Sequence, residues 1–126
     1  MRKIGEKENI MIEMKSTSRE LTKVERYRLT LSPEIQTVQD LTDDTVIHVS
    51  AFAEFDDINE ESGEVAHLLG ILDKDGKSYV TQSVTFKRSF SDIADIFADD
   101  GESEFSIRKI SGTTKANRPY VNCVLA

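Results

Sequence analysis

Residues 45–55 read TVIHVSAFAEF, and apolar side chains recur in this stretch at every second position. Successive side chains of a β-strand point to opposite faces of the sheet, so this period of two predicts a strand. One face, expected to look into the protein, would hold Ile47, Val49, Ala51, Ala53 and Phe55. The other face would hold Val46, His48, Ser50, Phe52 and Glu54. We therefore expect a long strand that is buried on one side.

Two more strands are expected after it. Residues 65–72, VAHLLGIL, are almost continuously apolar, as in a central strand that is buried on both faces. The acidic segment 56–64, DDINEESGE, would be the loop before them, and residues 73–76, DKDG, would form a tight turn after them. Residues 77–85 alternate again and predict the third strand.

A helix and a final hairpin complete this part of the chain. Ser89 and Asp92 are placed to cap a helix, and Gly101 is placed to end it. Residues 105–113 and 119–125 read as two strands that are joined by a short polar turn. The resulting order is strand, strand, strand, helix, strand, strand.

That β-β-β-α-β-β order is the one expected of an OB-fold, a five-stranded and partly open Greek-key barrel. We therefore expect a mainly β, OB-fold-like barrel over residues 44–126. The hydrophobic phase slips between Ile107 and Ile110, which predicts a β-bulge near Arg108 and Lys109.

The segment that precedes the barrel reads differently. Residues 1–15 are largely polar and are expected to be disordered. Residues 16–43 are expected to form a short helical extension. A threonine and a glutamate at capping-box spacing predict a helix over residues 23–30, and a Ser-Pro pair predicts a second helix over residues 33–40. Adjacent helices also permit a helix-turn-helix reading, but packing over one end of the sheet is the commoner use.

Composition limits the class of protein. The chain has 126 residues, 16 Lys and Arg against 23 Asp and Glu, and a net charge of −7. This length fits one domain, and no apolar run approaches the roughly 20 residues that a membrane span needs. Cys123 is the single cysteine and cannot form an internal disulfide, so we expect a fold held by packing alone, which suits a reducing cytoplasm.

No catalytic or metal-binding pattern emerges from the sequence. His48 and His67 have no cysteine partner at metal-ligand spacing, and no nucleophile motif accompanies them. The turn at 73–76 is too short for a calcium loop, and the glycines are too scattered to form a phosphate-binding loop. We therefore expect a protein that is not an enzyme and that uses no metal or cofactor.

Charge is strongly segregated in the last third of the chain. Residues 77–90 and 105–126 contain no Asp or Glu, whereas residues 91–104 contain six acids and no Lys or Arg. Segments that exclude negative charge from an acidic protein favour an anionic partner, and nucleic acid is the first candidate. The cations expected to contact phosphates are Lys77, Lys87, Arg88, Arg108, Lys109, Lys115 and Arg118.

Aromatic residues suggest how bases would be held. Strand alternation places Phe52, Tyr79 and Tyr120 on the more polar faces of three strands. Aromatic side chains exposed on a sheet give stacking platforms that contribute about 1 to 3 kcal/mol per base in single-strand binders. The alternative is that these aromatics cover a second small core and that the cations form a solvated surface.

Two segments resemble a known family. Residues 78–90, SYVTQSVTFKRSF, and 109–120, KISGTTKANRPY, resemble single-stranded DNA-binding proteins encoded by phages and mobile elements of Gram-positive bacteria, which have an OB-fold. The resemblance implies a protein that coats exposed strands during replication or recombination. It also implies a binding strand and its exit formed by Tyr79, Phe86, Lys87 and Arg88, and a loop and following strand that contribute Lys115, Arg118 and Tyr120.

Other readings stay open from the sequence alone. An acidic protein of this kind could instead be an interaction module or a DNA mimic that binds a host protein. Nothing in the sequence distinguishes RNA from DNA, because no feature is specific for a 2′-hydroxyl. Self-association and contacts with replication proteins are further candidates, and the acidic loop at 56–64 has no assigned role.

Overall fold

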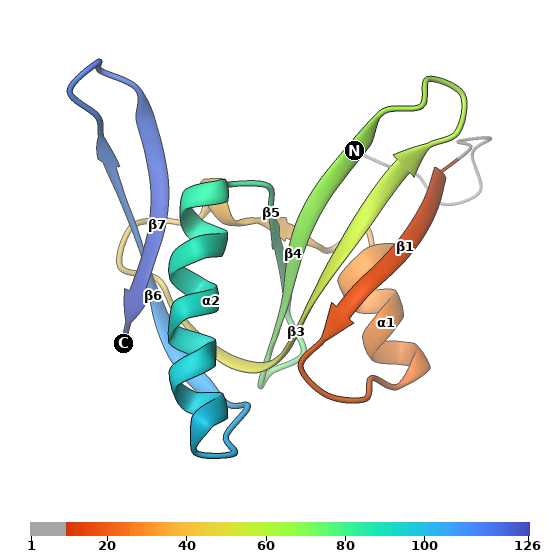
Figure 1. Cartoon of the computed structure of the whole chain (residues 1–126), viewed down its shortest axis with the longest axis horizontal. Coiled ribbons are helices and arrows are strands. Elements are labelled where there is room, and N and C mark those ends of the chain that lie inside the picture. Colours follow the sequence, from red (N-terminus) through yellow and green to blue (C-terminus); the bar gives the residue numbers. More distant parts are fainter. Residues whose placement is uncertain (1–9) are drawn as a thin grey trace.

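The computed structural model describes residues 10–126 and contains one curled, seven-stranded sheet with two α-helices packed on it (Figure 1). The sheet order is β2-β5-β4-β3-β6-β7, and β1 pairs with the far end of β3. The barrel elements are β3 (Val46–Asn59), β4 (Val65–Asp73), β5 (Ser78–Thr81), α2 (Val84–Asp99), β6 (Phe105–Thr113) and β7 (Pro119–Leu125). The predicted order of strands and helix is confirmed, and the architecture is consistent with an OB-like fold.

The sheet forms a half-barrel instead of a closed one. The edge of β5 that would complete a barrel pairs instead with β2 (Gln36–Thr37), in a parallel register that joins Gln36 to Tyr79. A 3-10 helix follows at once (Val38–Asp40), and its Val38 is fully buried in the barrel core. The segment predicted as a helix over residues 33–40 is therefore a short strand and a 3-10 turn. Pairing with an open edge satisfies backbone groups that would otherwise be buried unpaired.

A register shift in β3 divides the core. The shift lies between Val49 and Ala51 and inserts an extra residue, which exchanges the two faces of the strand. Ile47 and Val49 therefore lie in the main core, while Ala51 lies in a second core beneath α1. The expectation of a single inward face for residues 47–55 was wrong for this reason.

The main core lies between the half-barrel and α2. Phe86, Phe90 and Ala94 follow at four-residue spacing and are buried against the sheet. They pack with residues of five strands and of the 3-10 helix, namely Val38, Ile47, Val49, Leu69, Ile71, Tyr79, Phe105, Ile107, Val121 and Cys123. The helix thus covers the open side of the curled sheet.

Strand β1 (Ile10–Thr17) corrects another expectation. Residues 10–15 were expected to be disordered, but they pair antiparallel with β3 from Asn59 to Ala53. Since β3 continues to Asn59 and shortens the predicted loop at 56–64, its far end offers an edge to which β1 adds. Its apolar residues are Ile10, Met11, Ile12 and Met14, and Met14 packs against the second core. Residues 1–9, for which disorder was also predicted, lie outside the described residues.

Helix α1 (Lys23–Thr30) matches its prediction. The hydroxyl of Thr22 accepts a hydrogen bond from the Glu25 backbone N–H, and the Glu25 carboxylate accepts one from the Thr22 N–H. This capping box fixes the helix start, and the buried Leu29 fixes its orientation over the second core. No described helix is long and apolar enough to cross a membrane.

Helix α2 begins six residues earlier than the predicted cap at Ser89. Its N-cap is Ser83, whose hydroxyl accepts a hydrogen bond from the Phe86 N–H. Strand β5 consequently ends at Thr81, and Phe86, Lys87 and Arg88 belong to the helix. The bulge expected near Arg108 was also wrong, because β6 pairs with β7 in unbroken register.

Candidate nucleic-acid interface

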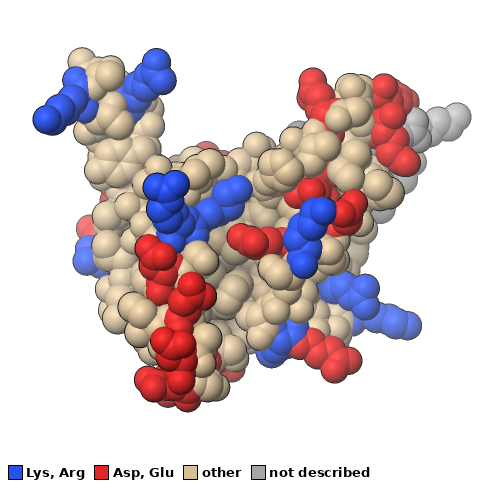
Figure 2. Space-filling model, in the orientation of Figure 1, with Lys and Arg blue, Asp and Glu red and all other residues tan. Residues whose placement is uncertain are grey.

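Two arms rise on either side of the N-terminal end of α2 (Figure 1). The basic arm is the β6–β7 hairpin, whose tip is the turn 114–118. The three-stranded arm consists of β1, residues 53–59 of β3 and residues 65–69 of β4, and its tip is the loop 60–64. Figure 2 shows a hollow between them, which we call the groove.

The two sides of the groove carry opposite charge. The turn 114–118 contributes Lys115 and Arg118, and the first two turns of α2 contribute Lys87 and Arg88, which gives two blue areas on the surface in Figure 2. The loop 60–64 carries three glutamates, and the rest of α2 is acidic. Both of these regions are red in Figure 2. The fold thus brings two pairs of cations, far apart in sequence, to the tip of the basic arm and to the N-terminal end of α2 between the arms.

A pocket of about 580 Å³ lies at the foot of the basic arm. The N-terminal end of α2 supplies Ser83 and Thr85, and the 3-10 helix supplies Gln39. The arm itself supplies Lys109, Ser111, Pro119, Tyr120 and Val121. Hydroxyl, amide and ammonium groups lie among apolar side chains in this lining, and the exposed carboxylate of Asp43 accepts a hydrogen bond from Ser111 beside it.

A second pocket, of about 340 Å³, lies at the foot of the three-stranded arm. Its lining residues are Lys15, Glu54, Phe55, Asp56, His67, Leu68 and Lys87. Lys87 reaches across from α2, and its Nζ donates to the His67 carbonyl oxygen at 3.1 Å. The two pockets therefore border the same end of α2, one on each side.

Asp56 is the most enclosed charged group of the second pocket. Its carboxylate accepts a hydrogen bond from His67 Nδ1 at 2.7 Å, and Lys15 Nζ lies 3.7 Å away. The hydrogen bond from His67 lowers the pKa of the Asp56 carboxyl, and the nearby ammonium of Lys15 adds to this effect. Asp56 therefore remains ionised and holds both partners on the surface of the groove.

Some predicted contact residues lie inside the protein. Tyr79 and Phe86 are 6% and 0% exposed, because both belong to the main core. Phe52 is partly buried, and its ring meets that of Phe90 at 4.9 Å. The register shift in β3 turns Phe52 inward, and the early start of α2 does the same for Phe86. These aromatics are not the exposed stacking platforms that strand alternation predicted.

Two predicted cations are engaged elsewhere. Lys109 is 4% exposed, donates to the Leu41 carbonyl oxygen at 2.6 Å and pairs with Asp43 at 3.2 Å. Arg108 lies on the outer face of the basic arm and pairs with Asp44 at 2.7 Å. Both side chains join the barrel to the segment that precedes it.

Lys77 and Tyr120 are both exposed, but Lys77 lies away from the groove and Tyr120 lies beside it. Lys77 follows β4 and so lies at the opposite end of that strand from the groove. Tyr120 is 40% exposed and its ring lies across Gly112, where an added Cβ would come within 2.5 Å of the tyrosine hydroxyl. Of the predicted residues, those that border the groove with exposed side chains or exposed ammonium groups are Lys87, Arg88, Lys115, Arg118 and Tyr120.

Lys15 was not among the predicted site residues, and no site role was predicted for His67. Lys15 lies in a segment for which no strand was predicted, and its approach to Asp56 depends on pairing between residues far apart in the chain. His67 lies directly opposite Asp56 in the β3–β4 register. The pair of Asp56 and His67 could not be predicted, because residues 56–59 were expected to form a loop and not to continue strand β3.

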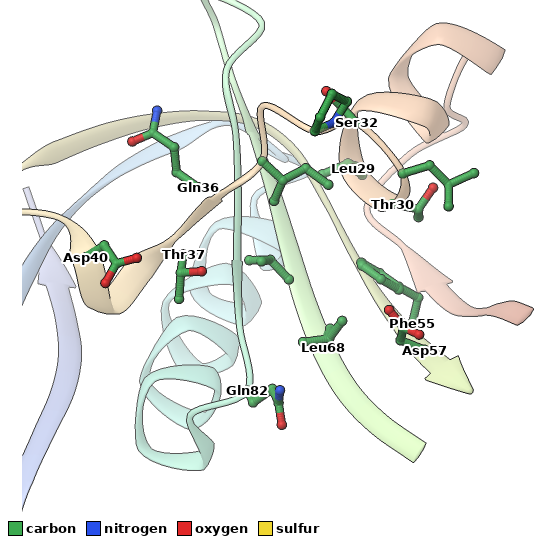
Figure 3. A pocket seen from close by; sticks show the side chains of 14 residues that line it. Leu29, Thr30, Ser32, Gln36, Thr37, Asp40, Phe55, Asp57, Leu68 and Gln82 are labelled. Atoms are coloured by element: carbon green, nitrogen blue, oxygen red, sulfur yellow. The ribbon is translucent and has the colours of Figure 1, made fainter. Parts of the chain in front are cut away.

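A third pocket, of about 760 Å³, opens on the outer face of the sheet beneath α1 (Figure 3). OB-folds commonly bind oligonucleotides on this face of their second and third strands. Here α1 and the segment 31–40 cover part of it, and the charged residues that line it are Asp40 and Asp57. The lining of this pocket contains no Lys or Arg, so it offers no cation to a phosphate.

Residues 10–126, the described part of the chain, contain no group of three or more His, Cys, Asp or Glu that could hold a metal ion.

Comparison with known proteins gives one match. A family model for the phage single-stranded DNA-binding protein, of the phi29 type, matches residues 5–125 and thus nearly the whole chain. No curated protein and no solved structure matches this chain.

Proposed function

The chain belongs to the family of phage single-stranded DNA-binding proteins, and on that basis we propose that it holds the strand in the groove between its two arms. Membership of this family makes it a non-enzymatic protein that binds single-stranded DNA. The observation that carries the proposed location is the placement of Lys115 and Arg118 on the basic arm and of Lys87 and Arg88 at the end of α2 between the arms.

These cations suit a phosphate backbone in position and number. Lys115 and Arg118 occupy the tip of the basic arm, and Lys87 and Arg88 lie at the N-terminal end of α2. The aligned peptide dipoles of this helix add partial positive charge at the same end. Phosphates that followed the basic arm toward α2 would meet positive charge at both ends of this path.

Neutral polar groups and Tyr120 supply the remaining contacts. Ser83, Thr85 and Ser111 line the pocket between the two cationic areas. The Thr85 hydroxyl can donate to a phosphate or sugar oxygen of any sequence, whereas the hydroxyls of Ser83 and Ser111 already donate to the Val121 carbonyl and to Asp43. Tyr120 offers a ring at the edge of the pocket. Such contacts suit a protein that coats strands without strong sequence preference.

Charge reversal tests the location. Lys115→Glu with Arg118→Glu should weaken binding of a labelled oligo-dT by at least about 100-fold at low salt, because two phosphate contacts become repulsive. Fluorescence anisotropy gives the affinity. The matched control is Lys74→Glu with Lys77→Glu, which makes the same change in net charge in the turn at the opposite end of β4. Equal losses in both variants would show that only overall charge matters and would reject the groove.

We propose that the bound strand is one exposed during replication or recombination of phage DNA in the bacterial cytoplasm. Replacing oligo-dT by oligo-rU of the same length tests whether RNA is also bound. Equal affinities would mean that the groove holds bases and phosphates without sensing the sugar.

Protein partners would dock away from the groove. The exposed side of α2 carries Asp92, Asp95 and Asp99 around Ile96, which is 66% exposed. An apolar side chain among carboxylates fits a replication protein with a basic, apolar patch. Light scattering of the free protein would first establish whether a second copy occupies any such surface.

A further inference from the structure

The inner face of the three-stranded arm carries an exposed apolar row. Strand pairing aligns Met11 with Ile58 and Ile58 with Val65. Met11 is 44% exposed and Val65 is 46% exposed. Three apolar side chains thus lie side by side near the tip of an arm whose loop is acidic.

The same face looks into the groove. The next row of the sheet aligns Glu13 with Asp56 and Asp56 with His67, and the last two line the second groove pocket. Side chains two residues apart on a strand share a face, so Ile58 and Val65 lie on the face of Asp56 and His67. The opposite face of the arm is the one that packs on the second core through Met14.

The two sides of the groove therefore differ in the chemistry of their side chains as well as in charge. The basic arm presents cations, whereas the three-stranded arm presents apolar side chains and an imidazole beneath a loop with Glu60 and Glu64. Phosphates are repelled from such a loop. Bases are uncharged and have flat apolar faces that gain by contact with apolar and aromatic side chains.

We propose that the inner face of the three-stranded arm, formed by Met11, Ile58, Val65 and His67, is the surface on which the bases of the bound strand rest. The backbone then turns its phosphates toward the basic arm and α2. This inference rests on the proposed location of the strand in the groove. It gives the acidic loop a role, because repulsion from this side orients the strand.

His67 is prepared for such contact. An ionised carboxylate only accepts hydrogen bonds, so the hydrogen bond to Asp56 places a proton on His67 Nδ1. This bond fixes the ring while 71% of the side chain stays exposed. A fixed, exposed ring loses little freedom when a base stacks on it, and imidazoles serve as stacking partners in single-strand recognition.

A single tryptophan tests the assignment, because the chain contains none. Val65→Trp places an indole in the apolar row, and Ile96→Trp places one on the acidic side of α2, where the native side chain is also exposed. Saturating oligo-dT should quench the fluorescence of the first variant by about half through base stacking and leave the second within a few per cent. Anisotropy of labelled oligo-dT, recorded on the same samples, reports binding independently of quenching.

The outcomes separate the two proposals. Binding by anisotropy without quenching of Val65→Trp, or with equal quenching of both variants, would overturn the base-contacting role while leaving the groove intact. Loss of binding in the charge-reversal control as well as in the basic-arm variant would instead overturn the groove.

A second measurement does not depend on an introduced indole. His67→Ala should lower affinity for oligo-dT by about tenfold, the range of one lost stacking contact, at every salt concentration. The slope of log affinity against log salt should stay unchanged, since no phosphate contact is removed. A shallower slope in His67→Ala would mean that phosphates lie on this arm and would contradict the proposal.

Discussion

Glu25 holds together the start of α1 and the chain before it. Its carboxylate accepts hydrogen bonds from Arg19 Nη2 at 2.8 Å and from the Thr22 backbone N–H at 2.9 Å. The hydrogen bond from Arg19, aided by that from Thr22, lowers the pKa of Glu25 from its ordinary 4.5 to about 2. A lowered carboxyl pKa means that the ionised form stabilises the folded state.

Glu25→Gln should therefore destabilise the protein by about 1 kcal/mol at pH 7, a value that allows for solvent screening at the surface. The difference from the wild type should be complete above pH 4.5, shrink as the pH falls and vanish near pH 2, where the folded wild type is protonated too. Urea unfolding followed by circular dichroism at several pH values measures it. A difference that stayed constant with pH would show that the carboxylate charge is irrelevant.

Cys123 should report global unfolding. Its thiol is 2% exposed, and burial raises its pKa to about 12. Alkylation needs the thiolate and access to reagent, so at pH 8 the folded protein should resist iodoacetamide while the urea-unfolded chain reacts readily. Mass spectrometry follows the reaction. Rapid labelling of the folded protein would mean that β7 detaches locally from α2.

Residues whose role depends on neighbours in sequence could be predicted, and others could not. The capping box of Thr22 and Glu25 is local and was read correctly. Phe86 was predicted to lie at the binding strand or its exit, because the helix was predicted to begin only after Ser89. Only the choice of Ser83 turns that ring into the core.

At the level of elements, the choice between two serines gives a direct test. Ser83 caps α2 through its hydrogen bond with the Phe86 N–H, whereas Ser89 lies within the helix. Ser83→Ala should cost about 1 kcal/mol of stability and loosen the turn that carries Lys87. Ser89→Ala should be neutral or slightly stabilising, since alanine favours a helix interior. Thermal unfolding of both variants measures this difference in stability. A larger loss in Ser89→Ala than in Ser83→Ala would show that Ser89 is the cap, as predicted from the sequence.

Elements with their own hydrophobic pattern were predicted well, and elements defined by pairing were not. Strand β4 and the hairpin of β6 and β7 have strong patterns that identify them from sequence. Strand β2 is polar and strand β1 has apolar side chains only as far as Met14, and both are defined by their pairing with open edges of β5 and β3. The same pairing creates the three-stranded arm, so that half of the groove was invisible in the sequence.

The whole molecule explains how a chain with a net charge of −7 binds a polyanion. Acids gather on the lower part of α2 and at the tip of the three-stranded arm, and four cations lie on the basic arm and at the N-terminal end of α2 (Figure 2). Local potential, rather than net charge, decides where an anion approaches, and screening over about 10 Å at 0.1 M salt keeps the regions separate. The segregation was readable in the sequence, but its arrangement across a groove required the fold.

The number of phosphates held by the groove sets the last prediction. Each phosphate neutralised on a single strand contributes about −0.7 to the slope of log affinity against log salt. Contacts from Lys87, Arg88, Lys115 and Arg118 should thus give a slope of about −3 for the wild-type protein. Lys115→Ala with Arg118→Ala should reduce this to about −1.5, while Val65→Ala should weaken binding without changing the slope, because it contacts bases only. Anisotropy titrations between 50 and 300 mM salt, on the order of the range used for such slopes, provide the values. A wild-type slope near zero would mean that the cations do not hold the strand, and the affinity would then have to come from base contacts alone.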